Sequence, residues 1–580
     1  MLGKSNVWGG PLEINVDPLR WGPGLDRAAY EAPSDEVKQL WVRRPDMVED
    51  SKSTSYCNKN SISTLVAIVT ILAIVLLIVK LKPLHHHPSS PTLDNYTLAL
   101  PKALLFFSAQ KSGKLPANNN VSWRGDSCLK NEQVGGYYDG GDSTKYNFPA
   151  AFSITMLSWS VLEYSHKYES ALELDHVKHT IQWGTDYLLK TFTSSANSTT
   201  TIASQLPAAN TTKCWIRPEE IQFPRSALHC TTCPALAAET AAALAAASIV
   251  FHDDTAYSKK LIHGADVIFK FATQGLGDKY SGVADPPSAF YNSSGFWDEF
   301  LWGGTWMYLA TGNSSYLKLI TSPELAQKVG SKPHSVLSWD NKLPGAALLL
   351  SRLRMFLDYG YPYEQALKKY QNQMDDIVCS YLPDSKKFNR TKGGLIMLNH
   401  GNPRPLQYVV NAAFSAKLYS DYIGAMYMPG ITCGGKFYGA EALEDFARTQ
   451  VDYILGKNPK QMSYVVGFGE RYPEEVDHMG ASIRSEEGKK YGCGGWKWRD
   501  SKKPNPNVIV GAMVGGPDKL DGFNDLRSNY NYTEPTLAGN SGLVAALVAL
   551  SHNATSNGID PNTIFYSVPL PWHCFSCKKH

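Results

Sequence analysis

"PALAAETAAALAAASIVF", residues 234–251, is the stretch that most restricts the fold of this chain. Glu239 is its only charged residue, and Ala, Leu, Ile and Val cover more than one face when the stretch is wound as a helix. A helix that is apolar on all sides is buried inside a protein rather than lying at its surface. The stretch therefore predicts a helix enclosed by other helices, in a domain built of concentric helical layers.

Helical periodicity recurs along most of the chain after Asp94, and alternating strand patterns are scarce. With residues 234–251 we expect about twelve helices, the others at 95–110, 149–168, 176–192, 257–271, 296–312, 313–329, 345–357, 363–378, 405–423, 444–455 and 541–551. No short-period repeat divides them. We predict one all-α domain over residues 94–566, followed by an irregular tail at 567–580.

The N-terminal part of the chain has a different character. Residues 61–79, "SISTLVAIVTILAIVLLIV", carry no charge, and about 20 apolar residues cross a bilayer core as a helix. A buried core helix is the alternative, but such helices usually keep a polar stripe. We predict a single transmembrane signal anchor between a polar cytosolic tail at 1–60 and a Pro/Ser-rich stalk at 80–93, "KLKPLHHHPSSPTL".

Glycosylation sequons indicate which side of the membrane the large domain occupies. Asn-X-Ser/Thr triplets begin at Asn95, Asn120, Asn197, Asn210, Asn292, Asn313, Asn389, Asn531 and Asn553, and none precedes the apolar stretch. Lysine and arginine are nearly balanced at its two ends and give little guidance. The sequons favour a type II topology with a lumenal or extracellular domain.

The cysteines fit an oxidising compartment. Nine of the ten follow the apolar stretch, where disulfides are permitted. Cys230 and Cys233 form a Cys-X-X-Cys pair, as do Cys574 and Cys577. A zinc site would need ligand spacings that the sequence lacks, so we favour local disulfides. An odd number leaves at least one thiol free or paired between chains.

Two acidic stretches stand out as candidates for chemistry. "GGYYDGGDSTKYNFP", residues 135–149, places Asp139 and Asp142 in a glycine-rich turn among aromatic residues. "FNDLRSNYNYTEPTLAGNSGLVAAL", residues 523–547, places Glu534 before an apolar helix. Paired carboxyl groups in an aromatic, sparsely charged site serve glycoside hydrolysis. A simple turn is the alternative for the first stretch, since Asp and Gly are common turn residues.

The second stretch resembles the C-terminal signature of family 9 glycoside hydrolases. The residues in register are Phe523, Asp525, Tyr530, Glu534, Thr536 and Asn540. "YYDGGD" is similar to the family's Asp-Ala-Gly-Asp loop, with Gly140 in place of Ala. Further similar motifs are "CWIRPEE" at 214–220, "SWDNKLPGA" at 338–346, "LQYVVNAAF" at 406–414 and "DYILGKNP" at 452–459. The polar tail, the anchor and "GGWKWRDSKKPNPN" resemble the KORRIGAN-type, membrane-anchored plant endo-1,4-β-glucanases of this family.

The resemblance implies an (α/α)6 toroid that hydrolyses internal β-1,4-glucosidic bonds with inversion, as a cellulase of plant cell-wall metabolism. It implies that Asp142 is the general base, that Asp139 helps to hold the attacking water and that Glu534 is the general acid. Asp525 joins this catalytic set through the same motif. Inversion implies a separation of about 6.5–9.5 Å between base and acid.

The resemblance also implies a set of substrate-binding residues: His478, Asp477, Arg527, Tyr530, Trp339, Trp302 and Arg217. Trp215, Trp297 and Trp306 are further candidates for sugar stacking, and a place in the core is the alternative for each tryptophan. The family's Val-His-His-Arg-Gly loop reads Val476-Asp477-His478-Met479-Gly480 here. Losing Arg removes a planar five-donor group, and Asp477 adds a carboxylate beside the catalytic ones. A catalytically impaired, glucan-binding or structural member is therefore the alternative function.

The expected partners are β-1,4-glucan chains, a membrane through one helix, and a cellulose-synthesising complex. No cofactor is expected to be required. Ca²⁺ enters only through the resemblance, because some relatives bind it, and no metal ligands are predicted. The net charge of +3 is small for this length, and the basic run at 489–504 is expected on the lumenal side, so no nucleic acid is expected. The expected location is the plasma membrane, Golgi or endosomal membranes.

Overall fold

The computed structural model describes residues 94–207, 214–274, 290–330, 336–486, 489–552 and 558–569. The predicted cytosolic tail, signal anchor and stalk lie outside these residues, as does the chain beyond 569. No helix in these ranges is long and apolar enough to cross a membrane.

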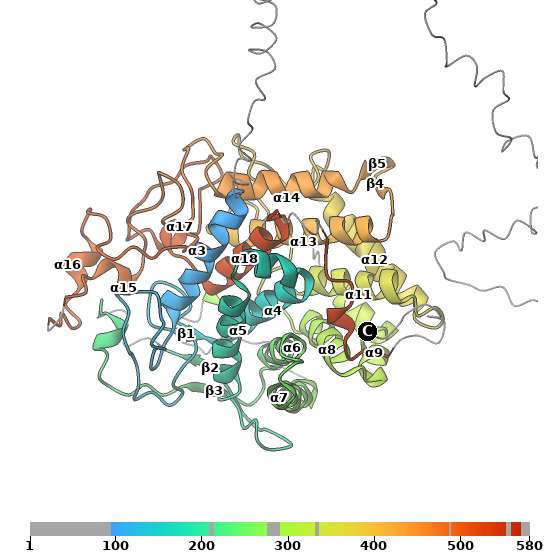
Figure 1. Cartoon of the computed structure of the whole chain (residues 1–580), viewed down its shortest axis with the longest axis horizontal. Helices are drawn as coiled ribbons and strands as arrows, with labels where there is room; N and C mark the ends of the chain where they lie inside the picture. The colour runs from blue at the N-terminus through green and yellow to red at the C-terminus, as the bar shows by residue number, and fades with distance from the viewer. Residues whose placement is uncertain are drawn as a thin grey trace, which may run out of the picture. The chain divides into compact units, whose positions relative to one another are not determined.

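Within the described residues, six helices form a closed ring. They are α4 (Asn147–Ser170), α6 (Pro234–Val250), α8 (Trp297–Thr311), α11 (Leu343–Leu357), α13 (Leu406–Ala425) and α18 (Leu537–Leu550). Each packs on the next in chain order, and α18 packs on α4 to close the ring (Figure 1). Helix α6 is buried along its whole length, which confirms the enclosed helix predicted for residues 234–251.

A second set of helices covers the ring from outside. They are α3 (Asn95–Gln110), α5 (Leu174–Leu188), α7 (Thr255–Gln274), α9 (Ser314–Ile320), α10 (Pro323–Val329), α12 (Glu364–Cys379) and α14 (Glu441–Ile454). Helix α3 packs on α18, α5 on α4, α7 on α6, α9 and α10 on α8, α12 on α11, and α14 on α13. This order is consistent with the predicted (α/α)6 toroid.

The structure departs from the predicted elements in several places. The helix predicted at 313–329 is split, because Pro323 begins α10 and the Ser322 hydroxyl accepts the Leu325 N–H at 3.2 Å as its cap. Short strands also occur that the sequence did not predict. They are β1 (Lys145–Tyr146), β2 (Ile202–Leu206) and β3 (Leu228–Cys230), in one antiparallel sheet, and the hairpin of β4 (Gly430–Cys433) and β5 (Lys436–Gly439).

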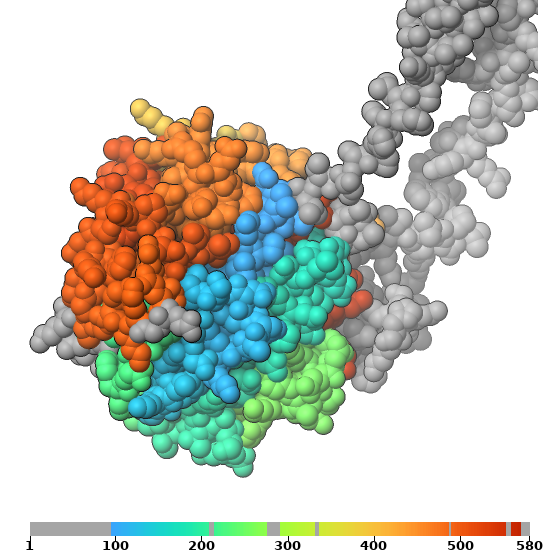
Figure 2. Space-filling view, turned by 60° about the vertical axis from the view of Figure 1, so that its left-hand side comes forward, coloured from blue at the N-terminus to red at the C-terminus, as the bar shows by residue number. Residues whose placement is uncertain are grey.

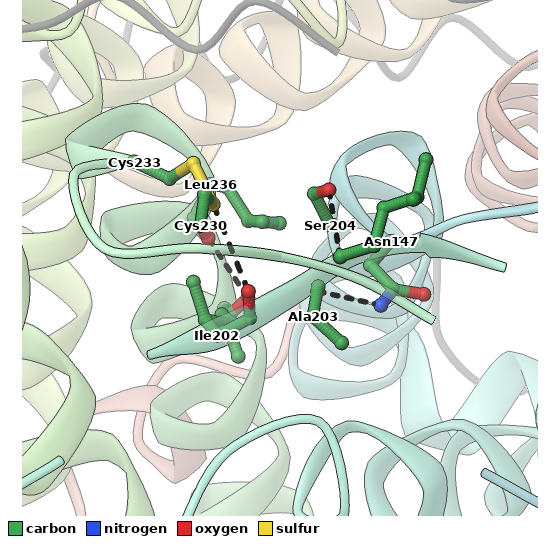
Figure 3. Close-up of a disulfide and its surroundings, with 9 residues drawn as sticks. Asn147, Ile202, Ala203, Ser204, Cys230, Cys233 and Leu236 are labelled. Atoms are coloured by element: carbon green, nitrogen blue, oxygen red, sulfur yellow. Dashed lines mark hydrogen bonds between the residues drawn. A yellow bond between two sulfur atoms is a disulfide. The ribbon is translucent and has the colours of Figure 1, made fainter. Parts of the chain in front are cut away.

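The local disulfide predicted for the first Cys-X-X-Cys pair is confirmed. Cys230–Cys233 joins the end of β3 to the residue before α6 (Figure 3). Two long-range disulfides, Cys214–Cys493 and Cys379–Cys433, were not predicted as pairs. Among the described cysteines Cys128 is free and buried, as the odd count requires. Cys574 and Cys577 lie outside the described residues.

The loops before two neighbouring ring helices bring distant parts of the chain together. The turn with Asp139 and Asp142 precedes α4, and Glu534 precedes α18. The Leu537 N–H donates to the Asp139 carbonyl at 3.0 Å, which joins the turn directly to the start of α18. The ring therefore places the two acidic stretches side by side at one end of the toroid.

Candidate active site

A cavity of about 390 Å³ lies at this end of the ring. Four carboxyl groups line it, from Asp139, Asp142, Asp477 and Glu534. Two guanidinium groups and several aromatic rings complete the wall: Arg404, Arg499, Tyr146, Trp215, Phe290, Tyr291, Trp496 and Tyr530. The structure thus brings together three of the four acids that the resemblance placed in the catalytic set, whereas Asp525 does not line the cavity.

Asp142 is held by its own turn. The Thr144 N–H and hydroxyl donate to its two carboxylate oxygens at 2.7 and 2.8 Å. Burial raises the pKa of Asp142, and these two bonds oppose that rise because they favour the ionised form. The side chain is therefore fixed in direction and suited to receive a proton.

Asp139 lies deeper, 5% exposed. The Tyr291 hydroxyl donates to one carboxylate oxygen at 2.5 Å, while the other, Oδ1, has no partner among the described residues. Burial raises the pKa of Asp139 to about 7, against the effect of the Tyr291 bond and with repulsion from Glu534. Buried water commonly satisfies such a carboxyl oxygen, which makes Oδ1 a candidate partner for a water molecule.

Glu534 contacts the aspartate turn directly. Its Oε1 accepts the Gly141 N–H at 3.0 Å, and its Oε2 pairs with Arg404. A Cβ atom on Gly140 would lie 2.7 Å from Oε1, so the absence of a side chain there lets the carboxyl approach. Burial raises the pKa of Glu534, Arg404 opposes this, and Asp142 adds to it. A raised pKa suits a general acid.

Arg404 is a site residue that the sequence reasoning missed. Its guanidinium lies over the rings of Phe290 and Tyr530, with the carbon at 5.5 and 5.9 Å from their centroids, and pairs with Glu534. The available signal was its place just before the motif at 406–414, which begins α13. Tyr291 was missed too, since nothing in the sequence ties it to Asp139.

The two positions that depart from the family loop lie inside the cavity. Asp477 faces Gly141, where a Cβ atom would stand 2.9 Å from its Oδ1. Burial, reinforced by repulsion from Glu534, raises the pKa of Asp477 well above its usual range. Met479, which begins α15 (Met479–Ser482), donates its N–H to the Gly141 carbonyl at 2.7 Å and lines the wall.

His478 does not line the cavity, contrary to the expectation that it binds substrate. Its Nδ1 accepts the Ala481 N–H at 2.9 Å, and its Nε2 lies 2.9 Å from Gln110 Oε1. Burial lowers its pKa to about 3, so the ring is neutral. Because Gln110 also donates to the Gly140 carbonyl at 2.8 Å, His478 supports the aspartate turn from behind.

Three other predicted site residues are structural instead. Arg217, 5% exposed, donates to the carbonyls of Gly480 and Ile483 at 3.0 and 3.1 Å. Arg527, 2% exposed, donates to the carbonyls of Ser501 and Lys503 and to Asn505. Asp525 accepts the N–H groups of Glu474 and Glu475 at 2.6 and 3.2 Å. All three hold loops around the cavity, because buried arginine and loop carbonyls satisfy one another.

Most of the predicted tryptophan platforms lie in the core or beside it. Trp302 and Trp306 are fully buried. Trp339 packs its edge on Tyr291, with ring centroids 4.8 Å apart, and so supports Tyr291 rather than the cavity. Trp297 lies beside Lys328, whose ammonium is 3.9 Å from its ring centroid. Trp215 alone of the five lines the cavity, and Tyr530, at the start of α17 (Tyr530–Thr533), does so as predicted.

The basic aromatic run at 489–504 contributes to this site. Trp496 and Arg499, the two ends of α16 (Trp496–Arg499), line the cavity. The Trp215 and Trp496 rings lie 6.1 Å apart, and the Cys214–Cys493 disulfide ties their two segments together. The unusual clustering of aromatic and basic residues was the signal in the sequence, and the disulfide explains why the run reaches the site.

The predicted glycosylation sites remain predictions. Six of the acceptor side chains are exposed, and they are Asn95, Asn120, Asn197, Asn292, Asn313 and Asn389. Asn531 is half-buried in α17. Asn210 and Asn553 lie outside the described residues.

The geometry defines a class of protein. Buried carboxyl groups with raised pKa values, one of them fixed in direction by two hydrogen bonds, face one aromatic-lined cavity. This is the equipment of a glycoside hydrolase. Over the residues that the structure describes, no group of three or more His, Cys, Asp or Glu is arranged to hold a metal ion.

Comparison with known proteins identifies the family. The family model described as glycosyl hydrolase family 9 matches residues 96–547, and the chain belongs to this family. Endoglucanase 25 of Arabidopsis thaliana is 55% identical, over 98% of both chains. Endoglucanase 10 of Oryza sativa subsp. japonica is 52% identical, also over 98% of both.

Solved structures agree with this assignment. The endoglucanase of the termite Nasutitermes takasagoensis is similar with a TM-score of 0.68 and 32% identity, over 79% of this chain and 98% of that one. Endoglucanase CelQ from Clostridium thermocellum, solved with cellobiose and cellotriose, gives 0.63 and 30%, over 84% of this chain and 73% of that one.

Proposed function

We propose that this chain is an endo-1,4-β-glucanase that cleaves internal β-1,4-glucosidic bonds of cellulose-like chains, with inversion, in an (α/α)6 toroid. One observation carries the proposal. The Gly141 N–H within the aspartate turn donates to Glu534 at 3.0 Å, although the two residues are 393 positions apart in the sequence. The candidate base and the candidate acid therefore face one cavity. The endoglucanase relatives, and CelQ with its bound cello-oligosaccharides, support β-1,4-glucan as the substrate.

The proposed reaction uses two carboxyl groups and one water molecule. Asp142 takes a proton from the water as its oxygen bonds to the anomeric carbon, and the Asp139 carboxyl holds this water. Glu534 gives its proton to the glycosidic oxygen as the bond from that oxygen to the anomeric carbon breaks. Attack from the face opposite the leaving group inverts the anomeric configuration. Both proton transfers use side chains of this chain, so the reaction requires no cofactor.

The aromatic side chains of the cavity wall are the proposed binding surface for the sugar chain. Trp215 and Trp496 lie side by side on one part of the wall, and Tyr530 and Phe290 lie beside Arg404 on another. Flat apolar rings pack on the faces of pyranose rings, while Arg404 and Arg499 offer donors to hydroxyl groups. The proposed polymer partner is therefore bound by aromatic rings and guanidinium groups in the cavity that holds the carboxyl groups.

The apolar stretch at 61–79 and the sequons support a type II membrane protein with this domain on the lumenal or extracellular side. The plasma membrane and Golgi or endosomal membranes are the proposed locations. A cellulose-synthesising complex is a proposed partner, because a membrane-anchored glucanase meets nascent glucan chains there.

The test is hydrolysis of carboxymethyl-cellulose by the full-length chain. We expect activity that falls about 10²–10⁴-fold in Glu534→Gln and is retained in Glu324→Gln, a matched change at an exposed glutamate of α10. A rapid loss of viscosity relative to new reducing ends identifies internal cleavage, and the first anomer seen by NMR identifies inversion. Equal rates in wild type and Glu534→Gln would refute the proposal.

A further inference from the structure

A second cavity, of about 560 Å³, lies outside the catalytic cavity and shares no lining residue with it. Its walls come from the end of α3, from the loop at 116–120 and from the length of α5. Helices α3 and α5 pack together, and Figure 2 shows the blue surface that follows α3 beside the teal surface of α5. A volume of this size lies within the range of small-molecule sites.

The cavity contains a buried ammonium group without a hydrogen-bond partner among the described residues. Lys111 is 7% exposed, lines the cavity, and has its Nζ 5.3 Å from the centroid of the Trp183 ring. Burial lowers the pKa of Lys111, and no carboxylate pairs with it in the described part of the chain. A buried charge without a hydrogen bond is costly, so this group is placed to donate to something that enters the cavity.

One further polar side chain on the cavity wall has no hydrogen-bond partner among the described residues. Both amide atoms of Asn119 are buried and lack partners among the described residues. Trp183, by contrast, is fixed, because its indole N–H donates to the Gly136 carbonyl at 2.9 Å. His176 is fixed too, by Glu173 at 2.8 Å and by Ser108 at 3.3 Å. The cavity thus combines a held aromatic ring with free donors and acceptors.

The charges on the wall select the class of ligand. Glu173, Asp175 and Asp186 line the same cavity, in which Lys111 supplies the single ammonium. This excess of negative charge opposes phosphate and other anions. An uncharged molecule rich in hydroxyl groups satisfies both the amide and the ammonium, and its apolar face packs on an aromatic ring.

We propose that this cavity is a second saccharide-binding site, separate from catalysis, for a short uncharged saccharide. Two sources supply such a ligand. One is a free glucan chain. The other is an N-linked glycan of this chain, since Asn120 lines the rim, is exposed and begins a sequon. The Trp183 bond to Gly136 also places this site behind the backbone that leads into the aspartate turn.

The experiment counts saccharide sites by equilibrium dialysis on the full-length chain. The chain carries Glu534→Gln, so that the probe is not cleaved, and Asn120→Gln, so that no glycan occupies the rim. The probes are labelled cellotetraose and labelled N,N′-diacetylchitobiose. We expect cellotetraose at two sites if glucan is the ligand, or diacetylchitobiose at one site if the glycan is.

Three further variants locate the second site. Lys111→Met keeps the apolar stem and removes the charge, and His179→Trp fills the cavity from α5. Each is expected to weaken the second site about tenfold or more, while Lys114→Met, a matched change at an exposed lysine three residues on, leaves it unchanged. Thermal unfolding confirms that each variant is folded.

Two outcomes identify the source of the saccharide, and two others would overturn the proposal. When Asn120 is restored and glycosylated, loss of diacetylchitobiose binding assigns the site to the chain's own glycan. A second cellotetraose site that is lost in Lys111→Met assigns it to glucan. A single cellotetraose site without any binding of diacetylchitobiose would overturn the proposal, and so would a second site that both cavity variants leave intact.

Discussion

Two arginine–glutamate pairs in this molecule have the same chemistry and opposite surroundings. Arg352 and Glu163, within the ring, lie 3.1 Å apart and both side chains are 0% exposed. Arg404 and Glu534, in the catalytic cavity, are 16% and 20% exposed. Both arginines stack on aromatic rings, Arg352 on Phe356 at 4.8 Å and Arg404 on Phe290 at 5.5 Å.

The two pairs differ in what surrounds each glutamate carboxylate. The second oxygen of Glu163 accepts from Trp159 at 3.1 Å and from Tyr422 at 2.6 Å, so that charge is enclosed by fixed donors. Glu534 faces the cavity with Asp139, Asp142 and Asp477 around it. Enclosure makes the first pair a structural element, whereas Glu534 faces an open cavity, where burial and repulsion from Asp142 raise its pKa and make the second pair chemically useful.

Removing the proposed base is expected to have the largest effect on activity. Asp142→Asn is expected to lower kcat about 10²–10⁴-fold, because the amide cannot take a proton from water. The midpoint of urea unfolding should change little, since the Thr144 bonds are local. Cellulose-derivative hydrolysis and urea titration measure the two effects. A large loss of stability with normal activity would place Asp142 among the structural acids instead.

The enclosed pair should respond in the opposite way. Arg352→Met leaves Glu163 buried and unpaired and is expected to lower the free energy of unfolding by about 3–5 kcal/mol. The specific activity of the folded fraction should be unchanged. The double variant Arg352→Met/Glu163→Gln is the control, and it should recover part of the stability in urea titrations. A stable Arg352→Met protein would contradict this reading.

Breaking the cavity pair should alter pH dependence more than stability. Arg404→Met removes the cation that favours ionised Glu534, so the pKa of Glu534 rises. The general acid must be protonated, so the basic limb of the kcat profile should move to higher pH, by about one unit. Arg404→Lys keeps the charge and should move it less. A basic limb that stays in place would show that Arg404 does not act through Glu534.

Asp477→Asn should give the smallest change. Burial and Glu534 hold the pKa of Asp477 well above its usual range, so Asp477 keeps its proton and adds little charge, and the basic limb should move by less than the shift in Arg404→Met. The pH profile of kcat measures it. The double change Asp477→His/Met479→Arg restores the family's loop, and a strong gain in activity would show that these two positions hold the enzyme back.

The sequence predicted well what depends on local pattern. The apolar spacing predicted helices of the ring and of the outer set, and residues 234–251 were predicted to be buried because apolar residues cover more than one face of that helix. Asp139 and Asp142 share one turn, so their proximity needs no tertiary information. The resemblance added Glu534 and the roles of all three acids. The Cys230–Cys233 disulfide is local in the same sense.

Other residues could not be assigned from sequence, because identical side chains serve the core and the cavity. Trp215 and Trp302 are equally aromatic, yet one lines the cavity and the other lies inside the ring. Arg217 and Arg527 lie in family motifs, but their guanidinium groups donate hydrogen bonds to loop carbonyls. Arg404 is marked in the sequence only by its place just before the motif at 406–414. Which way such a side chain points is set by packing between elements far apart in the chain.

The sequence by itself determined the helices and the acidic turn and, through its short motifs, the resemblance to the family, because helical periodicity and short motifs are local properties of the chain. Only the tertiary structure decided that Glu534 meets Gly141, that Arg404 and Tyr291 complete the carboxyl cluster, and that Lys111 is buried in a second cavity with no hydrogen-bond partner among the described residues. These facts depend on closure of the ring of α18 on α4 and on the packing of α3 against α5. Contacts of that kind join residues tens to hundreds of positions apart, and no local pattern records them.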